Sequence, residues 1–131
     1  MRVVVTGGRN YSDRTAVREM LVELGATAIA HGACGWEDVD LTHVTPEMLD
    51  RLRGADRLAD QVAIEMGRRA NRFPVKHSTD GPWPAAGPRR NRRMLVAFKP
   101  DVVLAFPGGR GTASCCAIAR ELGIPVMEAR P

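Results

Sequence analysis

The stretch "DVVLAFPGGRGTASCCAIAREL", residues 101–122, carries the clearest structural signal in the chain. It opens with a short apolar run, passes through a loop with three glycines, and ends in a segment whose apolar residues have helical spacing. A short β-branched run that feeds such a segment is typical of a buried strand followed by a helix. We therefore predict a strand at residues 101–107 and a helix at residues 112–122, which Gly123 ends.

The rest of the chain alternates in the same way between short apolar runs and segments with helical spacing. Strict alternation of strands and helices is typical of a parallel sheet covered on both faces by helices. We therefore predict an α/β fold, a sandwich with a parallel sheet of about five strands in the order 3-2-1-4-5. The other strands are predicted at residues 2–6, 26–32, 73–77 and 124–129, the other helices at residues 12–25, 55–70 and 89–99, and a loop at residues 78–88.

The chain has 131 residues, a length that fits one domain. The segment at residues 36–53 is too long for a strand-to-helix loop, which usually has about two to six residues. Inside it, Thr45 and Pro46 are typical of a helix start. We therefore predict a single domain over residues 1–131 with an insertion at residues 36–53. The insertion is either a lid or partner surface over the carboxyl edge of the sheet, or a decorated loop.

The chain has a net charge of +4, and arginine supplies nearly all of the positive charge. Arginine suits phosphate and carboxylate, because its planar fork donates two parallel hydrogen bonds. The charge is compatible with three alternatives: an anionic small ligand, a nucleic acid, or an arginine-rich surface. No apolar run approaches the ~20 residues of a membrane span, and no signal-peptide pattern follows Met1. We therefore expect a cytoplasmic protein.

Two glycine-rich loops, at residues 6–13 and 106–112, become neighbours at the carboxyl edge of the sheet if the strand order is 3-2-1-4-5. Glycine lets the backbone approach a ligand closely, and unpaired amides at a helix start favour an anion. We therefore predict a phosphate-binding site, with tight turns alone as the alternative; the P-loop and GxGxxG patterns are absent. Its predicted residues are Gly7, Gly8, Arg9, Gly108, Gly109, Arg110, Gly111 and Thr112, the last as the N-cap of its helix.

Further polar residues are predicted at the same edge. Gly32 follows the second strand, and Asp56 lies in the first turn of the second helix, where it either compensates the helix dipole or contacts a ligand. Arg90 and Asn91 open the third helix. Their alternative interpretation is a solvated basic helix start. Positive side chains at a helix start oppose the helix dipole. A nearby anion would therefore stabilise this helix start.

Signals for a metal and for a nucleophile are weak. His31, Cys34 and Asp56 match no standard zinc spacing, so we expect no metal and no cofactor. Ser114 and Cys115 fall in the first turn of the predicted helix, where a thiolate would be favoured. No histidine is linked to them in the sequence.

Four segments of the chain carry a family resemblance: VTGGRNYSD, HGACG with GADRLAD beyond the insertion, AAGPRRNRRM, and AFPGGRGTASC. Together they resemble the SLOG superfamily of Rossmann-like domains, and most closely its branch related to the YspA and YpsA proteins. The superfamily also includes the LOG-type phosphoribohydrolases and DNA-processing protein A. The resemblance implies a Rossmann-like three-layer sandwich with a pocket for nucleotides or nucleotide-derived ligands, in which residues 108–112 hold phosphate.

The same resemblance bears on catalysis. The LOG-type enzymes carry an arginine that Arg90 matches, a lysine where this chain has Asn91, and a glutamate where it has Cys115. The resemblance therefore favours binding of a nucleotide-derived ligand, as a sensor or a cryptic enzyme. The alternative is an N-glycosidic hydrolase acting on a nucleoside monophosphate or NAD-like molecule, with Arg90 as a catalytic residue and Asp56 as the carboxylate.

A second alternative is a single-stranded nucleic-acid-binding protein, as the DNA-processing relatives suggest. The RRNRR cluster at residues 89–93 would contact the backbone, and Tyr11, Trp36 or Trp83 would stack on bases. Aromatic residues make up only 5% of the chain, which counts against this alternative. Superfamily relatives often pair, so we expect a homodimer by analogy.

Overall fold

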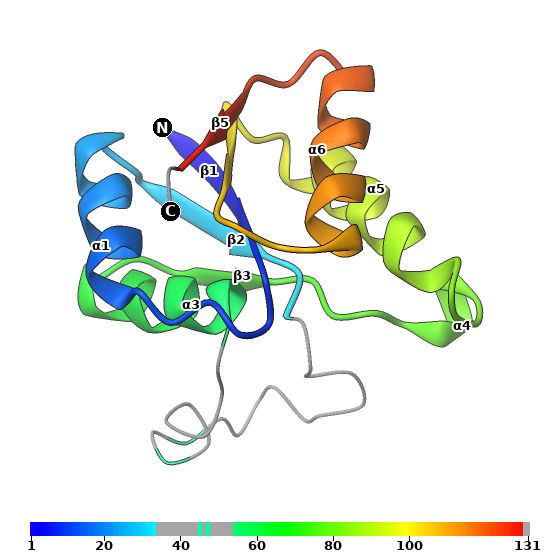
Figure 1. Ribbon diagram of the computed structural model, residues 1–131, viewed down its shortest axis with the longest axis horizontal. Coiled ribbons are helices and arrows are strands. Elements are labelled where there is room, and N and C mark those ends of the chain that lie inside the picture. The colour runs from blue at the N-terminus through cyan, green and yellow to red at the C-terminus, as the bar shows by residue number, and fades with distance from the viewer. Residues whose placement is uncertain (34–44, 46, 48–53, 130–131) are drawn as a thin grey trace.

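Five strands form one parallel sheet in the computed structural model, which describes residues 1–33, 45, 47 and 54–129. Their order across the sheet is β3-β2-β1-β4-β5 (Figure 1). The predicted α/β, Rossmann-like fold class and the predicted strand order 3-2-1-4-5 are confirmed. The strands are β1 (Arg2–Thr6), β2 (Ala28–His31), β3 (Ala70–Arg72), β4 (Val102–Ala105) and β5 (Val126–Glu128).

Strands β1 and β4 form the centre of the sheet. Val3, Val4 and Val5 have no exposed surface, and Val4 pairs with Ala30 on one side and Val103 on the other. A strand that is covered on both faces reads as a continuous apolar run rather than an alternating one. Because each buried valine contributes roughly 1.5–3 kcal/mol, these runs anchor the sheet.

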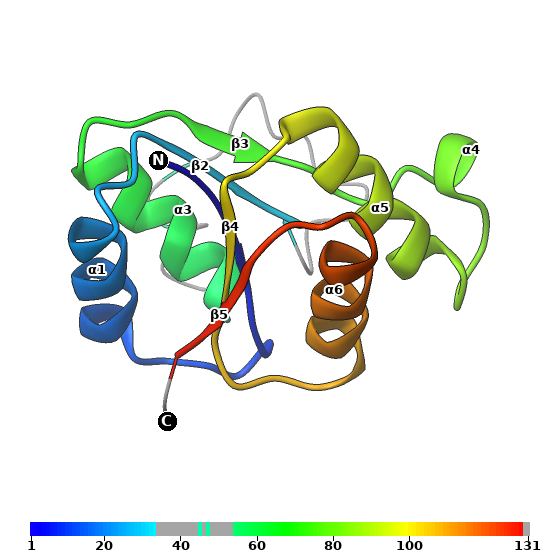
Figure 2. The same cartoon turned by 90° about the horizontal axis from the view of Figure 1, so that it is seen from above.

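Helices cover both faces of the sheet (Figure 2). They are α1 (Arg14–Glu23), α3 (Ala55–Glu65), α4 (His77–Asp80), α5 (Ala86–Phe98) and α6 (Arg110–Glu121). Side chains of α1 and α3 pack against Val3 and Val5, whereas those of α5 and α6 pack against Val4 and Val103. Successive side chains of a strand point to opposite faces, so each central strand contributes to both cores.

The third strand lies earlier than the sequence predicts. The prediction places it at residues 73–77, but β3 ends at Arg72, where it pairs with β2. Pro74 has no amide hydrogen for a strand ladder, and α4 begins at His77. The predicted strand is therefore wrong, and the predicted loop at residues 78–88 contains most of α4 and the start of α5.

Two helix ends also differ from the prediction. The α6 helix begins at Arg110 with Gly109 as its N-cap, so Thr112 lies inside the first turn and does not cap the helix. The α3 helix ends at Glu65 rather than at residue 70, because Gly67 adopts a φ of +69°.

The predicted insertion at residues 36–53 lies outside the described residues, apart from Thr45 and Glu47, and stays a prediction. Within the described ranges, no helix combines the length and the apolar character that crossing a membrane requires.

Candidate functional site

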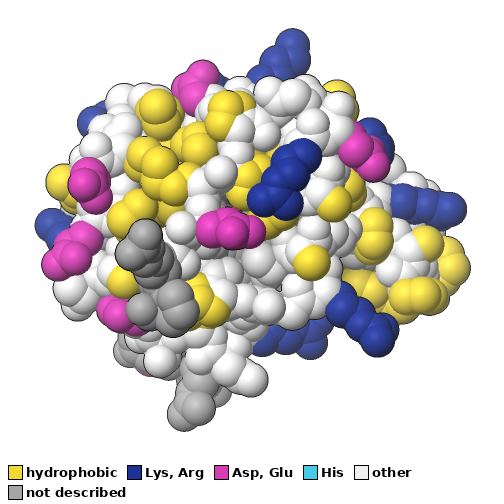
Figure 3. All heavy atoms as spheres, turned by 45° about the horizontal axis from the view of Figure 1, so that its top comes forward, with side chains coloured by type: hydrophobic (Ala, Val, Ile, Leu, Met, Phe, Trp, Pro, Cys, Tyr) yellow, Lys and Arg dark blue, Asp and Glu magenta, His cyan; other side chains and the backbone are white. Residues whose placement is uncertain are grey.

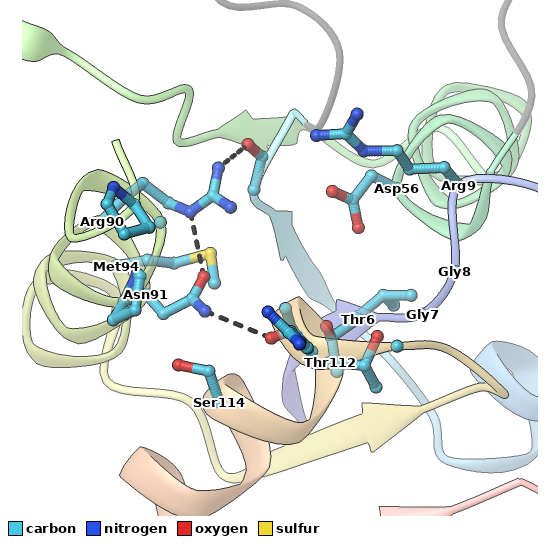
Figure 4. Close-up of a pocket in the computed structure, with 18 of the residues that line it drawn as sticks. Thr6, Gly7, Gly8, Arg9, Asp56, Arg90, Asn91, Met94, Thr112 and Ser114 are labelled. Carbon is cyan, nitrogen blue, oxygen red and sulfur yellow. Dashed lines mark hydrogen bonds between the residues drawn. The ribbon is translucent and has the colours of Figure 1, made fainter. Parts of the chain in front are cut away.

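The loops that follow β1 and β4 meet at the carboxyl edge of the sheet. The Gly8 amide donates to the Pro107 carbonyl at 2.9 Å, and the Ala55 amide at the start of α3 donates to the Gly8 carbonyl at 3.1 Å. Three segments that are distant in the sequence are thereby tied into one wall. The first half of α5 faces this wall (Figure 4).

A cavity of about 650 Å³ lies between these segments, within the size range of small-molecule sites. Gly108 lines a smaller neighbouring cavity, together with Cys116 and Arg120. Every other predicted site residue lines the larger one. These residues are Gly7, Gly8, Arg9, Gly32, Asp56, Arg90, Asn91, Gly109, Arg110, Gly111 and Thr112.

The glycines of the two loops fall into two groups. A Cβ atom at Gly7 would lie 2.5 Å from the nearest heavy atom and one at Gly8 3.0 Å, and at Gly108 it would clash with a side chain of α6. Packing requires glycine at these positions. A Cβ atom at Gly109 or Gly111 would have no atom within 4 Å, and neither residue has a left-handed φ. Packing does not explain these two glycines, and both leave room for a ligand to approach the backbone closely.

The first turn of α6 presents amides to the cavity. The Ala113 amide donates to the Gly109 carbonyl at 3.0 Å and begins the helical ladder. The amides of Arg110, Gly111 and Thr112 precede it, and no side chain caps the helix. Such amides carry the partial positive charge of a helix N-terminus, which favours an anion.

Arg90 is a buried cation on the α5 side of the cavity. It is 8% exposed, and its guanidinium is directed toward the cavity (Figure 4). Its Nε donates to Asn91 Oδ1 at 2.9 Å, and its Nη1 donates to the carbonyls of Gly32 and Phe73. In the part of the chain that the structure describes, no carboxylate forms an ion pair with it. Buried charges are normally paired with an opposite charge. The Arg90 guanidinium is therefore suited to pair with an anionic group of a ligand in the cavity.

Gly32 and Asn91 hold Arg90 and α6 in place. A Cβ atom at Gly32 would lie 2.7 Å from the Arg90 Cζ, so glycine lets the guanidinium reach the carbonyl. Asn91 Nδ2 donates to the Gly111 carbonyl at 3.3 Å, which ties α5 to the start of α6. Both predicted residues line the cavity, and both also position its charged groups.

Positive charge prevails around the cavity. The described lining contains three arginines, Arg9, Arg90 and Arg110, and one carboxylate, that of Asp56. Asp56 is 7% exposed and lies with Arg9 across the cavity from Arg90 (Figure 4). This excess of positive charge favours an anionic ligand.

A second buried ionic group lies at the end of β2. Asp60 Oδ2 is 2.7 Å from His31 Nε2, and Arg72 donates to both oxygens of Asp60 at 2.7 and 2.9 Å. The Ala33 amide donates to His31 Nδ1 at 2.9 Å, so His31 carries its proton on Nε2. Burial alone would raise the pKa of Asp60, but the hydrogen bonds from Arg72 and His31 lower it to about 2. His31 is fully buried and supports the turn after β2.

The thiol of Cys115 is buried. Its predicted place in the first helical turn is wrong, because α6 begins at Arg110. Burial raises the pKa of this thiol to about 12, and the nearby Cys116 and Asp56 act in the same direction. Ser114 lines the cavity, but no histidine of the described chain does. The arrangement provides no activated nucleophile at these positions.

The chain is similar to one curated protein over nearly its whole length. No protein-family model matches it. It is 36% identical over 137 residues to the Gene 61 protein of Mycobacterium phage D29, a match that covers 97% of this chain and 94% of that protein. The chain belongs to the family of this phage protein.

Two solved structures of UDP-GlcNAc 2-epimerases have the same fold as this chain. The structure from Neisseria meningitidis, bound to UDP-GlcNAc, matches with a TM-score of 0.58 at 20% identity. The structure from Methanocaldococcus jannaschii matches with a TM-score of 0.52 at 14% identity. Each match covers 98% of this chain but 31% of the epimerase chain, so the chain spans about a third of their length. At these identities the likeness concerns the fold alone.

Part of the cavity wall was not predicted from the sequence. One missed segment precedes α5 and was predicted to be a loop. Met94 is buried, and Arg90 lies four residues before it, on the same helix face. The spacing of four residues between Arg90 and Met94 is therefore the sequence signal that places both side chains at the cavity. Trp83 was predicted only as a stacking residue of the nucleic-acid alternative, and Ser114 only as a weak nucleophile candidate. The lining residues outside the predicted site are Val5, Thr6, Trp83, Pro84, Gly87, Pro88, Met94 and Ser114.

The RRNRR cluster does not form one basic surface. Arg92 pairs with Glu121 at 2.6 Å and Arg93 with Asp80 at 2.8 Å, whereas Arg90 faces the cavity. On the face drawn in Figure 3, Lys and Arg side chains are scattered among acidic and apolar ones. Non-specific binding of a single strand uses a continuous basic groove, so this arrangement gives the nucleic-acid alternative less support.

The aromatic residues of that alternative do not form one stacking surface. The Tyr11 ring packs against Phe106 with centroids 4.9 Å apart. Trp36 lies outside the described residues. Trp83 lines the cavity, apart from Tyr11.

Proposed function

We propose that this protein binds a nucleotide or nucleotide-derived ligand, whose phosphate lies between the start of α6 and Arg90. The environment of Arg90 carries the proposal. Arg90 is 8% exposed, its guanidinium is directed at the cavity, and no carboxylate of the described chain pairs with it. A buried charge without a counter-charge is costly, and a phosphate would supply the counter-charge. The amides of α6 and the open space at Gly109 and Gly111 support a phosphate at this place.

Two likenesses support the nucleotide part of the proposal. The resemblance to the SLOG superfamily assigns residues 108–112 to phosphate, and membership of that superfamily is part of the proposal. One solved structure with the same fold is an epimerase bound to UDP-GlcNAc, a nucleotide sugar. Both likenesses favour a small-molecule partner; the homodimer stays a prediction.

Thermal unfolding in the presence of AMP, ADP-ribose or NAD tests the proposal. A ligand that binds only the folded state raises the Tm, by roughly 5–10 °C at a concentration of about 100 times its Kd. We expect such a rise with at least one of the three compounds. No rise with any of them at millimolar concentration would refute the proposal.

The substitution Gly109→Asp tests where the phosphate lies. It places a carboxylate beside the α6 amides, at a position where a side chain meets no protein atom. We expect it to abolish the ligand-induced rise in Tm. The matched control is Ala117→Asp, which adds the same charge to an exposed position of α6 outside both cavities. If Gly109→Asp still binds, the phosphate lies elsewhere.

A second candidate function is hydrolysis of an N-glycosidic bond, which the position of Asp56 favours. Asp56 lies across the cavity from Arg90 (Figure 4). A carboxylate facing a ribose can stabilise positive charge on the sugar or act as a base toward water. Chromatography of AMP incubated with the protein should then show free adenine, and Asp56→Asn should stop its release without stopping binding. If no adenine appears, binding remains as the function.

A further inference from the structure

We infer that Trp83 is a stacking platform for a flat ring, so that the ligand of the cavity carries a nucleobase at the end opposite its phosphate. This inference rests on the proposed function and assigns a second subsite to the same cavity. Trp83 lines the cavity, yet it is 51% exposed. Tryptophan has a large apolar surface that proteins usually bury for the most part. A half-exposed indole inside a cavity therefore leaves apolar surface for a ligand to cover.

The indole of Trp83 is held in place on two sides. Its six-membered ring lies against α5, where a Cβ atom at Gly87 would be 3.5 Å from the Trp83 Cζ3. The ring of His77 in α4 meets it edge-on, with centroids 5.6 Å apart. An aromatic side chain fixed in this way loses little conformational entropy when a ligand stacks on it.

The segment that carries Trp83 is itself anchored. Arg93 of α5 donates to both carboxylate oxygens of Asp80 at 3.0 and 2.8 Å, and the Lys76 amide donates to Asp80 Oδ2 at 2.8 Å. Asp80 is 2% exposed, so this clasp fixes α4 on α5 from within. The platform is therefore preorganised.

The chemistry around Trp83 suits a ring rather than a phosphate. Its cavity-lining neighbours Pro84, Gly87 and Pro88 have no charged side chains, whereas Arg90 follows Gly87 by three residues on α5 and the α6 amides lie on another helix. Stacking of a base on an aromatic side chain contributes roughly 1–3 kcal/mol. A nucleotide has the two ends that such a cavity can bind, an anionic one and a flat one.

Isothermal titration with AMP and with ribose 5-phosphate tests the platform. The two probes share the phosphate and the sugar, and only AMP carries the ring. We expect the wild-type protein to bind AMP about tenfold or more tightly than ribose 5-phosphate. Trp83→Ala should remove about tenfold of the AMP affinity and leave the affinity for ribose 5-phosphate within about twofold. Trp83→Phe should retain most of the AMP affinity.

Val96→Ala is the matched control, because it shortens another exposed apolar side chain of α5 outside the cavity. Thermal unfolding verifies that each variant folds, and Trp83→Leu, which is apolar but has no aromatic ring, replaces Trp83→Ala if that variant does not fold. Equal losses for both probes in Trp83→Ala or Trp83→Leu, or no preference for AMP in the wild type, would overturn the platform and leave the phosphate site standing. If neither probe binds the wild type, the proposed function itself has failed.

Discussion

Two ionic groups near the ends of β2 and β3 differ in how their charge is balanced. In one group, Asp60 is fully buried and accepts hydrogen bonds from His31 and from two nitrogens of Arg72. In the other, Arg90 donates to two backbone carbonyls and one amide oxygen, and no described carboxylate pairs with it. The first group is closed within the protein, and the second opens on a cavity. The comparison teaches that burial alone does not single out a candidate binding residue, whereas an unbalanced buried charge does.

Removing the carboxylate of the closed group should have the largest effect. We expect Asp60→Asn to lower the free energy of unfolding by about 3–5 kcal/mol, because Arg72 loses the charge that pairs with it and the hydrogen bond from His31 loses a charged acceptor. Chemical denaturation followed by circular dichroism measures the loss. The control is Glu65→Gln at an exposed ion pair with Arg14, where we expect less than about 1 kcal/mol. Equal losses in the two variants would show that the closed group does not support the fold.

Removing the cation of the open group should act mainly on binding. We expect Arg90→Met to weaken nucleotide affinity by at least ~30-fold, because the phosphate would lose a desolvated partner. Three acceptors lose their donor, so the free energy of unfolding should fall by about 1–3 kcal/mol, less than in Asp60→Asn. Titration calorimetry and denaturation separate the two quantities.

The charge-matched control for that variant is Arg92→Met, since Arg92 lies on the same helix and pairs with Glu121 at the surface. Its affinity should stay within about twofold of the wild type. If both arginine variants bind alike, Arg90 does not hold the ligand, and the distinction between an open and a closed group fails.

Acid should weaken the closed group over a defined range of pH. The pKa of Asp60 is about 2 in the folded protein, below its ordinary value of about 3.9. Because folding lowers this pKa, the stabilisation is complete above the unfolded value and is lost as the pH falls from about 4 toward 2. The loss is on the order of 2 kcal/mol. Denaturation curves across this range of pH should show the loss of stability, and the loss should be smaller in Asp60→Asn. An equally steep fall in the variant would contradict the assignment of this pH dependence to Asp60.

The smallest effect is expected at Cys115, a buried group that takes part in neither ionic cluster. Its thiol is 1% exposed, and burial raises its pKa to about 12, so it stays neutral at physiological pH. Cys115→Ala should change nucleotide affinity by less than about twofold and stability by about 1 kcal/mol. A large loss of binding or of adenine release in this variant would show that the thiol acts on the ligand after all.

The sequence allows the fold to be predicted because its central strands are continuous apolar runs and its glycine loops follow them. The edge strand β3 could not be placed, since Ala70, Asn71 and Arg72 are half-buried and have no apolar run. The meeting of the two glycine-rich loops at one edge of the sheet follows from the predicted strand order. The environment of Arg90 could not be predicted from the sequence, because only the three-dimensional structure shows that no described carboxylate lies beside its guanidinium. Trp83 reaches the cavity through the packing of α4 on α5, a tertiary contact without a sequence pattern.

The pairing of β1 with β4 brings together residues about a hundred positions apart, such as Val3 and Val102. Contacts of such long sequence separation are slow to form, because a long loop must close first. The cavity lies between the loops that follow these two strands, so it exists only once the two ends of the chain have met. A ligand that fills the cavity binds only the folded state and therefore opposes the separation of β1 from β4. Occupancy of the site should therefore slow hydrogen exchange along the whole of β1 and β4, including Val3 and Val102, which do not line the cavity.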